Sequence, residues 1–509
     1  MILCSQLVNF VFATPEINRH RALFANNLSP MTTNTNTSAS AGAIETNDVA
    51  PIPAGERHGK PWHLFTVWSS PNLEFATVFV GALGIGFGLN VLQAILAVLV
   101  GNALAGITHG IFSTWGPSAG LPQMVLGRNA FGKIGNLLPS GLSTLVAGIG
   151  WFAVNTVSGT LALSALLGCD AVLALLIVIV AQVGIAFVGH NLIQVWERYS
   201  SYFLAVVWLI VAFVIFTHTG AFTPNPAISD FSFAAFTLTA GAAYGYTAGW
   251  TPFASDYTRY LPADTNKTRL GLAAGLGNFL STTILMSLGA VAFNLIETAV
   301  GDANGGQFVV FGENPTKVFT DALQNDGLAK ITLLAIAIGS ISANVLNVYS
   351  GAMSFLAMGV KLGFKTRRAI MVTIAGVLGG ITAYFGVANH DVGHQLENFL
   401  LVVSYWVAPW IAIVLVERVL SKGKDAGTRA LAPANTFAGV ISFVVATGFA
   451  IWGFSSQVLY KGPLSIAIHS FKLPDGSLTS VPDLAAVVGF VLAGLLYAIL
   501  RSVLGEAKK

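Results

Sequence analysis

Charged side chains are scarce in this sequence. They make up 9% of its 509 residues, whereas hydrophobic residues make up 54%. A soluble globular domain carries roughly 25% charged residues, so this composition excludes a water-soluble fold for most of the chain. The apolar residues gather in stretches of about 20, the length that a helix needs to cross a bilayer.

Cysteines and catalytic motifs are scarce as well. Only Cys4 and Cys169 are present, and they cannot form a disulfide framework of the secreted kind. The sequence contains no His-Glu-x-x-His motif, no P-loop and no paired catalytic carboxylates. We therefore expect no enzyme, no cofactor and no metal site other than one for a sodium ion. A receptor or a channel remains an alternative class.

The predicted fold class is an all-α polytopic membrane protein with about 12 transmembrane helices. We read the spans from long apolar runs separated by short polar loops. Their approximate ranges are 65–89, 91–112, 138–167, 171–189, 200–217, 232–254, 271–294, 331–359, 370–386, 399–416, 436–454 and 484–503.

The positive charges alternate between the loops. Of the 25 Lys and Arg residues, only Lys317, Lys330, Lys461 and Lys472 fall on one side of the predicted spans. Cytoplasmic loops retain positive charge, so both termini are predicted to be cytoplasmic. The predicted location is the plasma or inner membrane.

The first 60 residues differ from the rest. Asn, Thr, Ser and Ala dominate between Met31 and Ala54, a composition too polar to bury a core. We expect residues 1–60 to form a disordered cytoplasmic tail and residues 61–509 to form the transmembrane domain. No basic region precedes the first apolar run, which argues against a cleaved signal peptide. Met31 is a candidate natural start.

Two predicted helices are rich in glycine. The first contains Gly81, Gly84 and Gly86, and the sixth contains Gly245 and Gly249 ahead of a proline. Carriers built from inverted repeats place their sites at such interrupted helices. Five spans separate the two segments, as two repeats of five helices require. Close packing of helices against small residues is the alternative.

The third and eighth predicted helices carry polar groups at membrane depth. Trp151 and Asn155 lie four residues apart and so share one helix face. An aromatic plane beside an amide suits a flat heterocycle, because stacking contributes roughly 1–3 kcal/mol per base. Asn344 and Asn347 lie within a polar run of the eighth helix. Hydrogen bonding between helices is the structural alternative.

In this order, four segments resemble the nucleobase–cation symporters, a family of permeases for purines and cytosine, uracil, allantoin, thiamine and hydantoins. They are Gly116 to Gln123 followed by Arg128 to Gly132, Gly249 to Pro262, Asn344 to Ser350, and Ser404-Tyr405-Trp406. The resemblance covers about Trp62 to Arg501. It implies a fold of the leucine-transporter type, in which helices 1–5 and 6–10 are inverted repeats and two peripheral helices follow.

The resemblance also implies a substrate site. The stacking Trp of the family matches Trp151, and its polar partner matches Asn155, as in the purine–cytosine branch. The aromatic residue of helix 6 matches Trp250, or Thr247 beside Tyr246 by ungapped spacing. The remaining implied substrate contacts are Asn347, Asn344 and Thr77.

An ion site and a gate follow from the same resemblance. The sodium ligands of related carriers match Ala76, Phe79, Gly339 and Ser342, but Ala343 replaces a second hydroxyl. Glu74 is a candidate proton carrier, or else an ion-pair partner of Arg198 or Arg259. The coupling ion is therefore a proton or sodium, with the proton favoured. Four charged residues form a candidate inner gate or else a solvated surface: Asp256, Arg259, Glu197 and Arg198.

The expected function is import of a nucleobase, cytosine or a purine, by cation symport with alternating access. Alternatives are another neutral solute of the family (allantoin, hydantoin, uracil or thiamine) and an amino acid carried by the same fold. The expected partners are the small-molecule substrate, the coupling cation and the bilayer, without nucleic acid. The sequence leaves the individual base and the oligomeric state undetermined.

Overall fold

A computed structural model describes residues 49–506 apart from 189, 225–230, 301–314, 360–365, 367–368, 371–372, 389–391, 458 and 470–480. In this part of the chain the fold is helical throughout, and the only β contact is an isolated bridge between Ser456 and Lys461. Seven of these helices are long and apolar enough to cross a membrane by themselves, and four shorter apolar helices accompany them.

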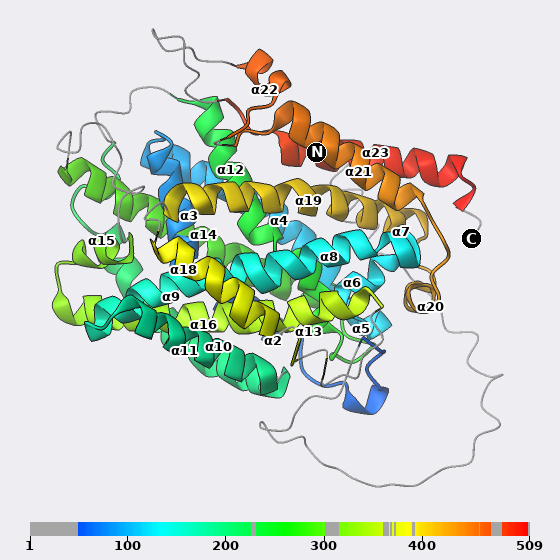
Figure 1. Ribbon diagram of the computed structural model, residues 1–509, viewed down its shortest axis with the longest axis horizontal. Helices are drawn as coiled ribbons and strands as arrows, with labels where there is room; N and C mark the ends of the chain where they lie inside the picture. Colours follow the sequence, from blue (N-terminus) through cyan, green and yellow to red (C-terminus); the bar gives the residue numbers. More distant parts are fainter. Residues whose placement is uncertain are drawn as a thin grey trace.

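Figure 1 shows the long helices side by side, with α21 and α23 along one edge of the bundle. The predicted spans all appear as helices, some in pieces. In chain order they are α2 (His63–Ser69) with α3 (Phe75–Gly86), α4 (Val91–Ser113), α8 (Leu137–Leu145) with α9 (Phe152–Leu167), α10 (Ala171–Val188), α11 (His190–Phe216), α12 (Phe233–Ala248), α14 (Lys267–Val300), α16 (Asp326–Ala357), α18 (Gly380–Ala388), α19 (Val392–Leu420), α21 (Ala438–Phe454) and α23 (Ala485–Val503).

The first span is broken between α2 and α3, where a short 3-10 helix (Ser70–Asn72) ends at Leu73. Glu74 is extended and caps α3 with its side chain. The predicted break at Gly81–Gly86 is wrong, because α3 runs through these glycines without interruption.

The sixth span breaks where its sequence suggests. The helix α12 ends at Ala248, and a 3-10 turn containing Pro252 (Thr251–Phe253) leads into α13 (Ala254–Thr258). Proline lacks the N–H that a continuing helix would need. The two broken spans therefore expose backbone groups inside the bundle.

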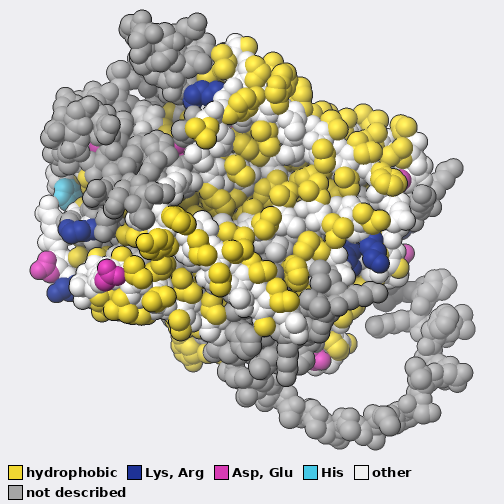
Figure 2. Space-filling view, viewed as in Figure 1, with side chains coloured by type: hydrophobic (Ala, Val, Ile, Leu, Met, Phe, Trp, Pro, Cys, Tyr) yellow, Lys and Arg dark blue, Asp and Glu magenta, His cyan; other side chains and the backbone are white. Residues whose placement is uncertain are grey.

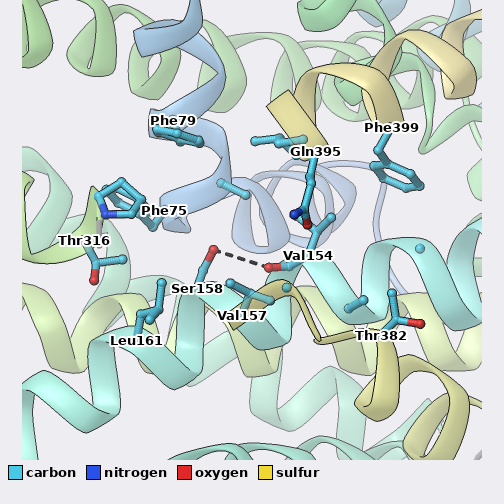
Figure 3. Close-up of a pocket in the computed structure, with 16 residues that line it drawn as sticks. Phe75, Phe79, Val154, Val157, Ser158, Leu161, Thr316, Thr382, Gln395 and Phe399 are labelled. Carbon is cyan, nitrogen blue, oxygen red and sulfur yellow. Dashed lines mark hydrogen bonds between the residues drawn. The ribbon is translucent and has the colours of Figure 1, made fainter. Parts of the chain in front are cut away.

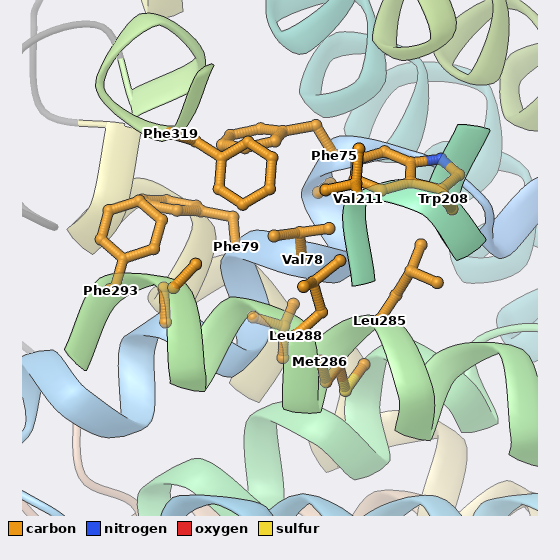
Figure 4. Packing of buried hydrophobic residues seen from close by; sticks show 14 of the residues in the cluster. Phe75, Val78, Phe79, Trp208, Val211, Leu285, Met286, Leu288, Phe293 and Phe319 are labelled. Atoms are coloured by element: carbon orange, nitrogen blue, oxygen red, sulfur yellow. The ribbon is translucent and has the colours of Figure 1, made fainter. Parts of the chain in front are cut away.

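The glycines of α3 serve close packing. A methyl group on Gly81 would lie 1.6 Å from the Met286 carbonyl oxygen, and one on Gly289 would lie 1.7 Å from the Val78 oxygen. The backbones of α3 and α14 thus touch directly, which only glycine permits. Figure 4 shows the aromatic layer beside this contact, formed by Phe75 and Phe79 of α3 with neighbours from α14, α11 and the short helix α15 (Pro315–Asp321).

Hydrophobic side chains cover the outer surface of the described helices. Val180, Leu209 and Phe213 are each at least 66% exposed. Figure 2 shows such side chains across the visible face, with charged residues gathered toward its two ends. An exposed apolar surface of this extent fits a bilayer and not water.

Residues 49–60 are attached to the bundle. Arg57 donates hydrogen bonds to the carbonyls of Ile52 and Pro117 at 2.9 and 2.7 Å, and the amide of His58 bonds to the Tyr260 carbonyl at 2.7 Å. The predicted tail boundary at residue 60 therefore falls after a packed segment. Residues 1–48 lie outside the described part. We refer to the side that carries residues 49–60 as the predicted cytoplasmic side.

Candidate functional site

The break in the first span is held by a buried polar cluster. Glu74 is fully buried, and its carboxylate accepts the amides of Ala76 at 2.8 Å and Thr77 at 3.2 Å, the first turn of α3. The phenol of Tyr246 on α12 donates to the same carboxylate at 2.9 Å, and the Thr77 hydroxyl lies 2.6 Å from that phenol. A carboxylate at a helix N-terminus is stabilised by the orphan N–H groups and the helix dipole.

Glu74 forms no ion pair with Arg198 or Arg259 in the described structure. Its carboxylate is satisfied by two amides and a phenol. The expectation of an ion pair at Glu74 is therefore wrong, since the group serves as the cap of α3.

The third span contains a π-helical stretch, Val146–Trp151, between α8 and α9. Such stretches shift the register of a helix and are frequent at functional sites. Trp151 sits at its end, and its ring meets Tyr246 and Phe399 edge-on, with centroids 5.1 and 5.0 Å apart. Gly249, at the break of the sixth span, lies against the same indole.

A cluster of buried amides lies next to this tryptophan. Asn155 donates to the Asn344 oxygen at 3.0 Å, and Asn344 donates to the Phe152 carbonyl at 2.9 Å and to Thr156 at 3.1 Å. Asn347 reaches the Asn344 oxygen only at 3.5 Å. Thr156 also donates to Gln182 of α10. Asn344 thus has its hydrogen-bonding capacity largely used.

Two acceptors of this cluster have no partner. The side-chain oxygens of Asn155 and Asn347 are buried and make no hydrogen bond to any described residue. Leaving a buried polar atom unpaired costs about 1–3 kcal/mol, so such atoms point to a missing ligand or water. Both lie on the neutral side chains predicted to contact a substrate.

Trp250 takes a different position from Trp151. Its indole N–H donates to the Asn72 oxygen at 2.9 Å, and its ring packs near Trp68 and Phe253. Thr247, the alternative match, donates to Asn102 of α4 at 2.6 Å. The aromatic residue of the sixth span that contacts Trp151 is Tyr246, and the structure does not bring Trp250 together with Trp151.

A cavity of about 190 Å³ is lined in part by Phe399, whose ring also packs edge-on against Trp151 (Figure 3). Its walls are mostly apolar and come from α3, α9, α15, α18 and α19. Phe75, Phe79, Val157 and Leu161 contribute apolar surface, while Ser158, Thr382 and Gln395 are among its few polar groups. Ala76 also lines it.

The predicted ion ligands separate into two places. Ala76 and Phe79 line that cavity, whereas Gly339 lies against the Leu73 carbonyl and Glu74. Ser342 donates to Glu197 at 2.6 Å and lies 3.4 Å from the hydroxyls of Ser70 and Ser200. Gly339 and Ser342 therefore lie against the break in the first span, at Leu73, Glu74 and Ser70.

The four predicted gate residues are also distributed. Asp256 is buried and accepts the Gln123 amide at 2.9 Å, with Arg259 as its nearby positive charge. Arg259 is fully buried over the Tyr260 ring. Glu197 is buried against Ser342, and Arg198 is exposed. The structure therefore brings together Asp256 and Arg259 and records no contact between this pair and Arg198.

Sequence comparison identifies the family. The family model described as "Permease for cytosine/purines, uracil, thiamine, allantoin" matches residues 51–458. The chain belongs to this family of permeases. It is therefore a secondary transporter of small solutes and not an enzyme, and the resemblance read from its motifs is confirmed.

Curated relatives of this permease include nucleobase carriers. It is 27% identical over 479 residues to a purine-cytosine permease of Emericella nidulans, covering 90% of this chain and 88% of that one. It is 28% identical to a purine-cytosine permease of Saccharomyces cerevisiae, covering 72% and 70%. A vitamin B6 transporter of the same yeast is 23% identical, covering 73% and 64%.

Solved structures confirm the fold. Mhp1, a nucleobase-cation-symport-1 family transporter, in a closed conformation with bromovinylhydantoin bound, matches with a TM-score of 0.68 at 19% identity, covering 90% of this chain and 95% of that chain. A sodium-coupled sialic acid symporter matches with a TM-score of 0.63 at 13% identity, covering 88% and 91%. The leucine-transporter-type arrangement predicted from the sequence is thus confirmed.

Several polar residues of the site were not predicted. Tyr246, Ser70, Ser200 and Gln182 all contact predicted residues. Gln182 could have been identified from the sequence, because it is the only strongly polar side chain of the apolar helix α10. The serines gave none, since isolated serines are common in packed membrane helices.

Proposed function

We propose that this permease imports a neutral nucleobase, cytosine or a purine, together with a cation. The observation that carries the proposal is the pairing of Trp151 with the unpartnered oxygens of Asn155 and Asn347. A nucleobase presents a flat ring for the indole and amino or ring N–H groups for two acceptors. Stacking contributes roughly 1–3 kcal/mol.

The charge of the site favours a neutral ligand. Asn155, Asn344 and Asn347 are uncharged, and the nearby carboxylate of Glu74 is occupied as a helix cap. A charged ligand would bring an uncompensated charge to membrane depth, which is costly. The nucleobase names of two relatives support the same substrate class.

The transport route follows from the broken helices. The apolar cavity beside Phe399 would admit substrate from outside, and the opposite side, which carries residues 49–60, would face the cytoplasm. Broken helices at the centre of inverted repeats allow each side to open in turn. Asp256 and Arg259 would close the inner side.

The coupling ion is proposed to be a proton. Ser342 bonds directly to a carboxylate, and Ala343 supplies no oxygen where a second hydroxyl would be needed. Hard cations require several oxygen ligands. Ser342 bonds to Glu197 and Ser70, whereas Ala76 and Phe79 line the apolar cavity, which weighs against the sodium alternative.

Uptake into proteoliposomes tests the function. We expect saturable uptake of labelled cytosine, adenine or hypoxanthine, displaced by unlabelled bases and unaffected by alanine or leucine. Ligands should also raise the melting temperature of the purified permease, because a hundredfold excess over Kd adds about 2.7 kcal/mol to the free energy of unfolding. Uptake of another solute with none of these bases would contradict the assignment.

A further inference from the structure

Glu197 is a buried carboxylate outside the substrate cluster. It lies on α11, is 3% exposed, and accepts the Ser342 hydroxyl at 2.6 Å through Oε2. Its Oε1 makes no hydrogen bond to any described residue. No Lys or Arg in the described residues pairs with it. A buried carboxylate without a compensating charge is costly, so this group is suited to bind a cation or a proton.

Hydroxyls surround this carboxylate. Ser342 comes from α16, Ser70 from the short helix before the break, and Ser200 from α11 itself, with both of the last two 3.4 Å from the Ser342 oxygen. Three helical segments therefore meet at one carboxylate. One of these segments, α16, also carries Asn344 and Asn347.

The remaining neighbours add little charge. The phenol of Tyr257 on α13 lies close enough to Glu197 for the two groups to interact electrostatically. His63 on α2 and the exposed Arg198 lie toward the predicted cytoplasmic side. The helix α10 carries no ionisable side chain, and α14 carries them only near its ends, at Lys267, Arg269 and Glu297.

A cavity connects Glu197 with the predicted cytoplasmic side. It measures about 400 Å³ and is lined by Trp62, His63, Thr66, Val67, Glu197, Arg198 and Tyr202. Trp62, Arg198 and Tyr202 are exposed, while Glu197 is buried. The carboxylate thus lies at the buried end of a cavity that opens toward the predicted cytoplasmic side. There a proton can be released to water.

We propose that Glu197 is the proton-binding site that couples transport to the proton gradient. The step is binding of one proton to a Glu197 carboxylate oxygen in the outward-open state and its release through the cavity at His63 and Arg198. No other atom is transferred. The proposal rests on the proposed function for the identity of the carried solute.

The geometry explains why a proton would change the structure. Protonated Glu197 is neutral, still accepts from Ser342, and gains an O–H that can donate to Ser70. The segment before the break is then held to α11 and α16. After release, the bare carboxylate favours hydration, which draws water into the cavity and loosens α2 from α11.

Accumulation in proteoliposomes tests the coupling. We expect Glu197→Gln to retain exchange of labelled nucleobase across the membrane and to lose accumulation driven by an imposed pH gradient. Asp326→Asn, which changes an exposed carboxylate at the start of α16, is the matched control and should retain both. Accumulation that persists in Glu197→Gln, that is lost only in Glu74→Gln, or that follows a sodium gradient would overturn the proposal.

Infrared difference spectroscopy gives a readout that needs no substrate. Across a pH titration of the purified permease, the C=O bands of protonated carboxyl groups should include one band that is present in the wild type and missing in Glu197→Gln. If this band disappears as expected while the wild type exchanges no nucleobase, the proton site stands and the assigned solute is wrong. An unchanged band in Glu197→Gln overturns the proton site.

Discussion

The buried asparagines differ in how fully they are bonded. Asn344 accepts from Asn155 and donates to Phe152 and Thr156, whereas the oxygen of Asn347 has no partner in the described residues. A fully bonded amide contributes to folding, and a partly bonded one is available to a ligand. The same residue type therefore has two roles within one helical turn.

This difference predicts separate effects of two substitutions. Asn347→Ala should weaken nucleobase binding by about 1–3 kcal/mol with little loss of stability, because the side chain makes only one long hydrogen bond, to Asn344. Asn344→Ala should lower the melting temperature, because it strands Asn155 and Thr156. Ligand titration and thermal unfolding of both purified variants measure this. Equal losses of stability would contradict the assignment.

Trp151 is predicted to act through its ring. Trp151→Ala should reduce affinity by roughly 1–3 kcal/mol through lost stacking, while insertion into the membrane remains. Trp452→Ala is the control, since Trp452 is 53% exposed on α21 and far from the amide cluster in sequence and packing. Wild-type affinity in Trp151→Ala would place the substrate elsewhere.

The sequence predicted neighbours well wherever a helix is regular. Trp151 and Asn155 share a face as their spacing requires, and Asn155 meets Asn344 of the eighth span. Trp250, assigned from the family resemblance, lies apart from Trp151 because it follows the end of α12, where helical periodicity no longer fixes the direction of a side chain. Helical spacing predicts which side chains are neighbours only as far as the point where the helix breaks.

At the level of helices, glycine has two structural roles, a helix break and a close contact between helices, and the sequence alone does not distinguish them. Gly249 stands at a break, whereas Gly81 stands inside an unbroken helix and touches the backbone of α14. Ala76 and Phe79 were assigned to the ion site from the family resemblance and not from the position of a break, so that assignment stays a prediction. Sequence spacing located the helix but not the point of interruption.

The helix contact predicts the cost of an added methyl group. Gly81→Ala and Gly289→Ala should sharply lower the yield of folded protein, because the new carbon would overlap backbone atoms that cannot move aside. Gly448→Ala on α21 has no atom within 4 Å and should be neutral or slightly stabilising. Fluorescence-detected size exclusion and melting curves compare the three.

For the whole molecule, the charge count predicts orientation as well as the number of spans. With Cys4 and Cys169 replaced by serine, Lys330→Cys should react with an impermeant maleimide from outside intact cells. Lys424→Cys should react only after permeabilisation. Both side chains are exposed, so access and not burial decides the result. The reverse pattern would invert the predicted topology.

The attachment at Arg57 couples the N-terminal segment 49–60 to the helix bundle. Its guanidinium joins Ile52 to Pro117, so the connection after α4 and the chain entering α2 are fastened together. If the cytoplasmic entrance opens beside α2, residues 49–60 must move together with α2, or the hydrogen bonds of Arg57 must break. Cleavage, phosphorylation or fusion of the N-terminal tail would therefore change the rate of transport without altering any contact to the solute.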